Sequence, residues 1–113
     1  SIVRQHHLSW RTALSNVSGV YLISDQSNGM QYVGSAYGGI GLWARWSAYA
    51  ATGHGGNKEL RQLLRDHGDS YADNFQYSVV EVCDINASSE FIISRECHWK
   101  NVLLSREFGY NHN

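Results

Sequence analysis

The sequence predicts an α+β domain in which a small three-stranded antiparallel sheet is flanked by helices, in the order ββααβα. Segments rich in β-branched and aromatic residues alternate with segments whose apolar residues recur at helical spacing. The predicted strands are 19–24, 31–35 and 75–82, and the predicted helices are 41–51, 58–67 and about 88–105. A length of 113 residues suits one hydrophobic core, so we expect a single domain over 1–113.

The N-terminal residues 1–16 are expected to form an extension or a short helix over Leu8–Ser15. Because the chain starts on Ser1 and stops abruptly at Asn113, we expect it to be a piece of a longer protein. The first residues lack the apolar core of a signal peptide, and no uncharged apolar stretch approaches the roughly 18 residues of a membrane helix. We therefore expect a cytoplasmic protein with no membrane contact.

The first two strands are predicted to form a hairpin, because Asn28-Gly29 between them is the strongest short hairpin signal. With a two-residue turn at these positions, Tyr21 and Tyr32 project from the same face of the sheet, since side chains alternate along a strand. A register shifted by two residues keeps this result, whereas a shift by one residue would break it.

Two helices and a third strand follow the hairpin. The helical pattern that starts at 41 is ended by the glycine-rich run 52–56. Asn57 is suited to cap the next helix, and Gly68 is suited to end it in a left-handed conformation. The segment 75–82 has apolar residues on both faces, which predicts the central strand of the sheet.

The last predicted helix places an acid on its apolar side. On a helical wheel, Ile92 and Trp99 point toward the core, and Glu96 falls between them. A carboxylate directed at a small core is costly unless it meets a cation, a metal or several hydrogen-bond donors. Glu96 is therefore either a partner in a structural salt bridge, with Arg45 or Arg95, or a functional ligand.

The charge of the chain is unevenly distributed, although the formal net charge is only −1. Residues 1–65 contain six Lys and Arg against two Asp and Glu, a net +4, and residues 66–113 contain three against eight, a net −5. A basic footprint over the whole domain is thus absent, and any basic face lies on the first half. Cys83 and Cys97 are too few for a disulfide scaffold; we expect two buried free thiols, and a single bridge between them is the alternative.

Several polar side chains are candidates for a site. Tyr21 and Tyr32 suit either simple packing with their hydroxyls at the rim or a role in a site. Arg45 and Tyr49 are four residues apart and therefore share a helical face, and a guanidinium suits bidentate binding of a phosphate. His54, in its glycine-rich loop, is either merely exposed or a proton carrier.

Taken in order, these features resemble the GIY-YIG nuclease family. Gly19-Val20-Tyr21 and Tyr32-Val33-Gly34-Ser35 are similar to the two motifs that name the family, each with Val where the name has Ile. The likeness covers about 17–113, nearly the whole chain. Five later segments continue it, namely Leu42–Arg45, Asn57–Leu60, Phe75–Glu81, Glu96–Trp99 and Gly109–Asn111.

The resemblance implies a metal-dependent endonuclease that hydrolyses phosphodiester bonds in DNA with one divalent cation, Mg²⁺ or Mn²⁺. In the family pattern, Tyr21 would be the general base and Tyr32 would orient the attacking water. Arg45 would bind the scissile phosphate, Glu96 would be the metal ligand, and Tyr49 would stand at a further catalytic position.

Three more residues are expected to bind substrate: His54, Lys58 and Asn111, the last of which would otherwise brace the site. The loop between Tyr32 and Arg45 is longer than in the shorter relatives, which makes it either a substrate-shaping loop or a neutral insertion. Family members generally obtain specificity from an appended DNA-binding domain, which this chain does not contain. Whether the DNA is single-stranded, double-stranded or branched stays open.

Two other classes of function remain as alternatives. One is a catalytically silent nucleic-acid-binding or assembly module on the same fold, and the other is a protein-interaction domain that uses exposed tryptophans. The nuclease hypothesis requires Tyr21, Tyr32, Arg45 and Glu96 to meet in one pocket. A carboxylate at position 96 on the far side of the sheet from the two phenols would contradict it.

Overall fold

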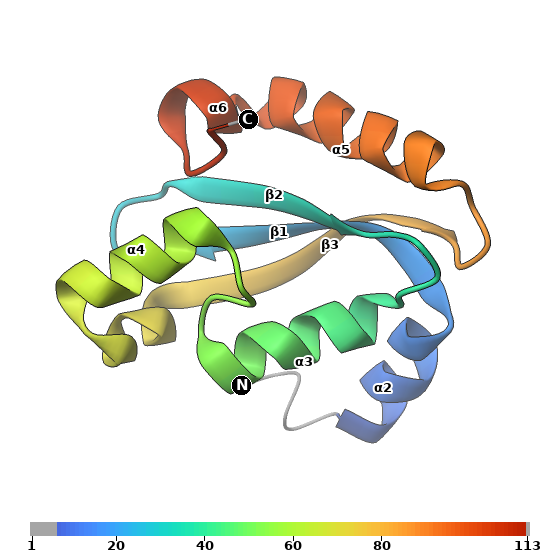
Figure 1. Cartoon of the computed structure of the whole chain (residues 1–113), viewed down its shortest axis with the longest axis horizontal. Helices are drawn as coiled ribbons and strands as arrows, with labels where there is room; N and C mark the ends of the chain where they lie inside the picture. Colours follow the sequence, from blue (N-terminus) through green and yellow to red (C-terminus); the bar gives the residue numbers. More distant parts are fainter. Residues whose placement is uncertain (1–6, 113) are drawn as a thin grey trace.

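The computed structural model of the protein describes residues 7–112, with side chains from residue 11 onward. In chain order the elements are α2 (His7–Ser15), β1 (Val17–Asp25), β2 (Gln31–Ala36), α3 (Leu42–Thr52), α4 (Lys58–His67), the 3₁₀ helix η1 (Asp69–Asn74), β3 (Phe75–Asp84), α5 (Ser89–Leu103) and α6 (Ser105–Phe108) (Figure 1). The predicted α+β class and element order are confirmed, with η1 as an element that the sequence pattern did not predict. Within the described residues, every helix is too short and too polar to cross a membrane.

The sheet has the strand order β2-β1-β3, and both neighbouring pairs are antiparallel. The prediction that 75–82 forms the central strand is therefore wrong, because β1 lies in the centre. Apolar residues on both faces of a strand do not show whether both of its edges are paired. On the edge strand β3, Val82 is 59% exposed.

The hairpin between β1 and β2 has a longer loop than the two-residue turn that Asn28-Gly29 predicts. Ile23 pairs with Tyr32 and Tyr21 pairs with Gly34, so the register is shifted by two residues. The N–H of Gly29 (φ 78°) donates to the carbonyl oxygen of Asp25 at 2.7 Å and closes a four-residue loop, 26–29. The shift is even, and Tyr21 and Tyr32 still share one face.

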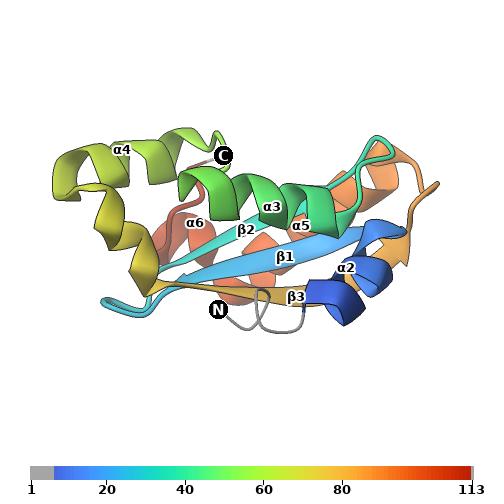
Figure 2. The same cartoon turned by 90° about the horizontal axis from the view of Figure 1, so that it is seen from below.

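Helices cover both faces of the sheet (Figures 1 and 2). α3 and α4 lie on one side, and α5 and α6 lie on the other. Tyr21 and Ile23 of β1 face the first side and pack in the main core, whose helical members are Leu14, Leu42, Trp46, Tyr49, Leu60 and Leu64. Val20 and Val33 alternate to the second side and, like Ile92 of α5, are completely buried.

The helix ends follow the predicted signals in part. The Asn57 side chain accepts a hydrogen bond from the N–H of Leu60 at 2.9 Å, as expected of a cap. Gly68 ends α4 with a positive φ of 93°, but its ψ of 157° is extended rather than the predicted left-handed form. α5 ends at Leu103, earlier than predicted, because Leu104 adopts a left-handed conformation. Both cysteines are free thiols, as predicted, but only Cys83 is buried, and Cys97 is partly exposed.

Candidate active site

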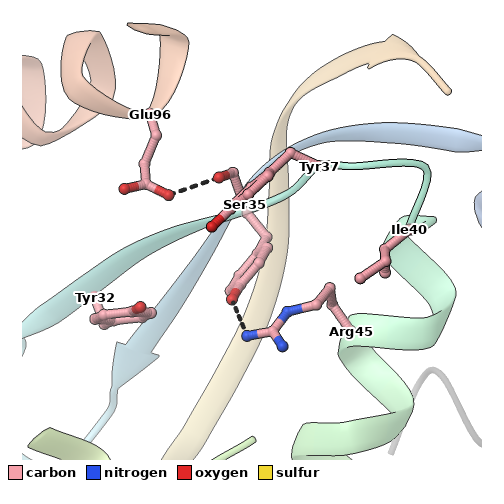
Figure 3. Close-up of a pocket in the computed structure, with 7 residues that line it drawn as sticks. Tyr32, Ser35, Tyr37, Ile40, Arg45 and Glu96 are labelled. Atoms are coloured by element: carbon pink, nitrogen blue, oxygen red, sulfur yellow. Dashed lines mark hydrogen bonds between the residues drawn. The ribbon is translucent and has the colours of Figure 1, made fainter. Parts of the chain in front are cut away.

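A pocket of about 350 Å³ opens beside the outer edge of β2. Figure 3 shows Glu96 on one side of this strand and Tyr32 and Arg45 on the other. The pocket is lined by Tyr21, Tyr32, Ser35, Tyr37, Ile40, Arg45 and Glu96. The four side chains that the nuclease hypothesis requires therefore border one cavity.

Tyr21 reaches this pocket because the edge strand carries a glycine opposite it. Its phenol lies against Gly34, where an added Cβ would come within 2.5 Å of both Cζ and Oη of Tyr21. Any larger residue at position 34 would push the phenol away. Gly34 of the second motif thus leaves room for the phenol of Tyr21 from the first motif.

Glu96 reaches the pocket from the other side of the sheet. It lies on α5, which covers the face opposite to Tyr21, and its Oε1 accepts a hydrogen bond from Ser35 Oγ at 2.6 Å. Ser35 alternates with Gly34 and so points toward α5. The carboxylate is not separated from the phenols, because β2 is an edge strand and the pocket borders both of its faces.

The partner of Glu96 is Lys100 rather than the predicted Arg45 or Arg95. Lys100 Nζ lies 2.8 Å from Glu96 Oε2, and the lysine side chain is only 3% exposed. Arg95 instead pairs with Glu81 at 2.9 Å. The wheel analysis overlooked Lys100, although its i, i+4 spacing from Glu96 was a readable signal.

A second polar group lies behind the pocket. Tyr21 Oη and Tyr49 Oη are 2.7 Å apart, and Arg45 Nη2 donates to Tyr21 Oη at 3.3 Å. The Arg45 guanidinium also lies 5.6 Å from the centre of the Tyr49 ring. Tyr49 is completely buried, so it touches Tyr21 and Arg45 rather than the pocket itself.

Arg45 is the positive charge that acts on the tyrosines of this group. Burial raises the pKa of Tyr21, while the hydrogen bonds from Tyr49 and Arg45 and the positive charge of Arg45 oppose the rise. Burial likewise raises the pKa of Tyr49 and of Tyr32. The Nε of Arg45 is buried without a hydrogen-bond partner among the described residues, which leaves one guanidinium donor uncommitted.

Tyr32 connects the pocket to a second cavity of about 400 Å³ beside the start of α4. The other residues around that cavity are Asn57, Lys58, Glu59, Tyr110 and His112. Of the three predicted substrate-binding residues, Lys58 is therefore near the site. His54 borders neither cavity, and its Nδ1 accepts a hydrogen bond from the N–H of Gly56 at 2.9 Å.

Asn111 is placed to brace the sheet rather than to touch a substrate. Its side chain is buried, its Oδ1 accepts from the N–H of Val33 at 2.7 Å, and its Nδ2 donates to the Val33 carbonyl at 2.9 Å. The N–H of Tyr110 donates to the carbonyl of Gln31 at 2.8 Å. The C-terminal segment thus supplies hydrogen-bond partners for backbone groups on the outer edge of β2, next to the pocket.

Only one acidic residue, Glu96, borders the pocket, and the described residues contain no group of three or more His, Cys, Asp or Glu that could hold a metal ion. A carboxylate at a cavity wall suits Mg²⁺, which prefers oxygen ligands and keeps several of its waters. Ser35 contacts one oxygen of Glu96 and Lys100 contacts the other, and a carboxylate offers about four lone-pair positions in total. The donor set therefore fits one hydrated cation held through a single protein ligand.

Two solved structures share this fold. One is a mutant of the catalytic domain of the intron endonuclease I-TevI, with a TM-score of 0.64, 28% identity, and coverage of 86% of this chain and 94% of that domain. The other is the catalytic domain of the homing endonuclease I-TevI, with a TM-score of 0.57, 32% identity, and coverage of 83% and 96%. No protein-family model and no curated protein sequence matches the chain.

The fold and these similarities show that the chain is homologous to the catalytic domain of a nuclease. It belongs to the GIY-YIG nuclease family, as the paired tyrosine motifs predict. Homology to an endonuclease catalytic domain supports nuclease activity in general.

Proposed function

We propose that this protein is a metal-dependent DNA endonuclease whose site is the pocket at the edge of β2. The observation that carries the proposal is the meeting of Tyr21, Tyr32, Arg45 and Glu96 around one cavity. These side chains come from β1, β2, α3 and α5, and a packing role alone does not require a guanidinium, two phenols and a carboxylate to converge. Similarity to the catalytic domain of a homing endonuclease supports DNA as the substrate.

Arg45 is the residue that would bind the scissile phosphate. Arg45 lines the pocket and its Nη2 donates to the hydroxyl of Tyr21, so the same guanidinium can bind a phosphate oxygen in the pocket next to the base. A guanidinium fixed before the substrate arrives also stabilises the negative charge that develops on phosphorus oxygens in the transition state.

Tyr21 would act as the general base and Tyr32 would orient the water. Tyr21 must be a phenolate to accept a proton from the attacking water, and burial makes that form scarce at neutral pH because it raises the pKa. The hydrogen bonds from Arg45 and Tyr49 offset part of this cost. Tyr32 lies on the same face and borders the same pocket, where its hydroxyl can hold the water next to Tyr21.

Glu96 would hold the divalent cation, Mg²⁺ or Mn²⁺. A bound cation supplies positive charge to the transition state and to the leaving oxygen. The chain's own contribution is to hold the carboxylate in place, with Ser35 on one oxygen and Lys100 on the other.

Cleavage of labelled DNA in the presence of Mg²⁺ or Mn²⁺ tests the proposal. Arg45→Ala and Glu96→Gln should abolish cleavage, while Arg61→Ala, which removes an exposed arginine of α4, should leave it unchanged. A folded wild-type chain that cuts no single-stranded, double-stranded or branched DNA would refute the proposal. So would full activity in Arg45→Ala.

One observation favours a second candidate, a catalytically silent nucleic-acid-binding module on the same fold. The Lys100 ammonium already neutralises Glu96, so the carboxylate does not need a metal ion for charge balance. The silent module predicts DNA binding that is independent of divalent cations and no cleavage. The endonuclease predicts that Glu96→Gln keeps DNA binding and loses cleavage.

A further inference from the structure

The pocket has an apolar lip that phosphate chemistry does not need. Tyr37 and Ile40, in the loop between β2 and α3, line the same pocket as Arg45 and Glu96. They are 44% and 47% exposed, so both side chains are accessible from solvent. Figure 3 shows Tyr37 extending from the loop across the pocket near Ser35, and Ile40 beside Arg45.

The loop that carries this apolar lip is held in a defined shape. Ser18, which is completely buried in β1, donates its hydroxyl to the carbonyl oxygen of Ile40 at 3.0 Å. The N–H of Ile40 donates to the Tyr37 carbonyl at 3.3 Å, and the two residues between them, Gly38 and Gly39, have φ values of 69° and 84°. These φ values favour glycine, so the turn presents its two flanking side chains in one arrangement.

A phosphodiester bound at Arg45 would carry a nucleoside on each side, and the apolar lip borders the same pocket as Arg45. A nucleobase has an apolar face that stacks on aromatic rings. Within a duplex both faces of a base are covered by its neighbours, so an aromatic side chain can stack only on a base that is unpaired or extruded. The apolar lip therefore suits a strand whose bases are free.

We propose that Tyr37 and Ile40 bind the nucleobase next to the scissile phosphate, and that the pocket thereby selects single-stranded DNA. This inference rests on the proposed endonuclease function. It agrees with the formal net charge of −1, because a duplex with two charged strands demands more neutralisation than one strand does. Base stacking then supplies affinity that does not depend on charge.

Fluorescence anisotropy on the full chain without divalent cations tests the inference. The probes are a labelled oligothymidine of about 16 nucleotides, a strand of equal length built from abasic units, and a duplex of equal length. Tyr37→Ala should weaken binding to oligothymidine by roughly 5- to 150-fold and leave binding to the abasic strand unchanged. The wild-type chain should bind oligothymidine more tightly than either other probe.

Phe108→Ala is the matched control, because Phe108 is an aromatic side chain that is 73% exposed and lies outside the pocket. It should change none of the three affinities. If Tyr37→Ala lowers the affinity for the thymidine strand and for the abasic strand equally, Tyr37 contacts the backbone and the inference is overturned. Equal wild-type affinity for single strand and duplex, or no binding to any probe, would overturn it as well.

The outcomes separate this inference from the function on which it rests. If Tyr37→Ala does not change oligothymidine binding, the base contact is refuted. Cleavage of DNA by the same preparation would still support the endonuclease. A wild-type chain that binds the single strand through Tyr37 but cuts no DNA refutes the nuclease and keeps the base site.

Discussion

The ion pair between Lys100 and Glu96 makes a sharp prediction for Lys100→Met. This change removes an ammonium that is 3% exposed and lies 2.8 Å from Glu96 Oε2, while it keeps an unbranched side chain of similar length. Breaking a buried pair by removing one partner costs about 3–5 kcal/mol, because the other charge is left uncompensated. The Glu96 side chain is 16% exposed and borders a cavity that water can enter, so its hydration lowers the expected loss to about 2–3 kcal/mol.

This loss can be measured by thermal unfolding. For a domain of this size, each kcal/mol corresponds to about 4 °C, which predicts a fall in Tm of about 8–12 °C. Lys58→Met is the control, because Lys58 is exposed at the start of α4 and has no ion pair among those identified in the described residues. Its Tm should not change. The double variant Glu96→Gln/Lys100→Met should melt above Lys100→Met, because it leaves no unpaired charge.

A divalent cation should then replace the missing ammonium. If Glu96 is the metal ligand, Mg²⁺ or Mn²⁺ stabilises the folded chain by an amount that grows with the logarithm of its concentration. We expect this stabilisation to be larger in Lys100→Met than in the wild-type chain and absent in the double variant. A Tm of Lys100→Met equal to that of the wild type would refute the energetic argument. A cation effect that persists without Glu96 would refute the assignment of the ligand.

Four other predictions test the remaining parts of the site and fold. Gly34→Ala should displace the phenol of Tyr21, lower the stability by about 1–3 kcal/mol and abolish cleavage, and a fully active variant would contradict the close contact. Because burial raises the pKa of Tyr21 and the base must be deprotonated, the logarithm of the cleavage rate should rise with pH above 7, and this slope should disappear in Tyr21→Phe. Although burial alone would raise the pKa of Asp25, the hydrogen bonds to its carboxylate hold that pKa below the usual value. The contribution of this carboxylate to stability is complete above about pH 4 and is lost as the pH falls through the lowered pKa. Asp25→Asn should therefore make the Tm depend less steeply on pH in the acid range. Asn111→Leu should cost about 1–3 kcal/mol for each buried Val33 group that it leaves unpaired, and an unchanged Tm would show that the C-terminal segment does not brace β2.

Local rules predicted the parts of this molecule that depend on neighbours in the sequence. The cap at Asn57 and the shared face of Tyr21 and Tyr32 follow from side-chain chemistry and from strand alternation, and the latter survived a change in loop length because the shift was even. The wheel of α5 correctly turned Glu96 inward. The partner of Glu96 could also be found by a local rule, because Lys100 lies four residues further along the same helix.

The position of the site could not be derived in this way, because it depends on which strand is at the edge. Strand alternation places Tyr21 on the α3 side, and Glu96 approaches from α5 on the other side, so a central β2 would have kept them apart. The two can border one cavity only because β2 is the outer strand and carries Gly34 and Ser35, the first allowing the phenol to approach and the second holding the carboxylate. Hydrophobic patterns report which faces of a strand are covered, whereas edge positions are set by long-range pairing. The two motifs therefore supply Tyr21 and Tyr32 of the candidate site, and the topology of the sheet makes them neighbours of Glu96.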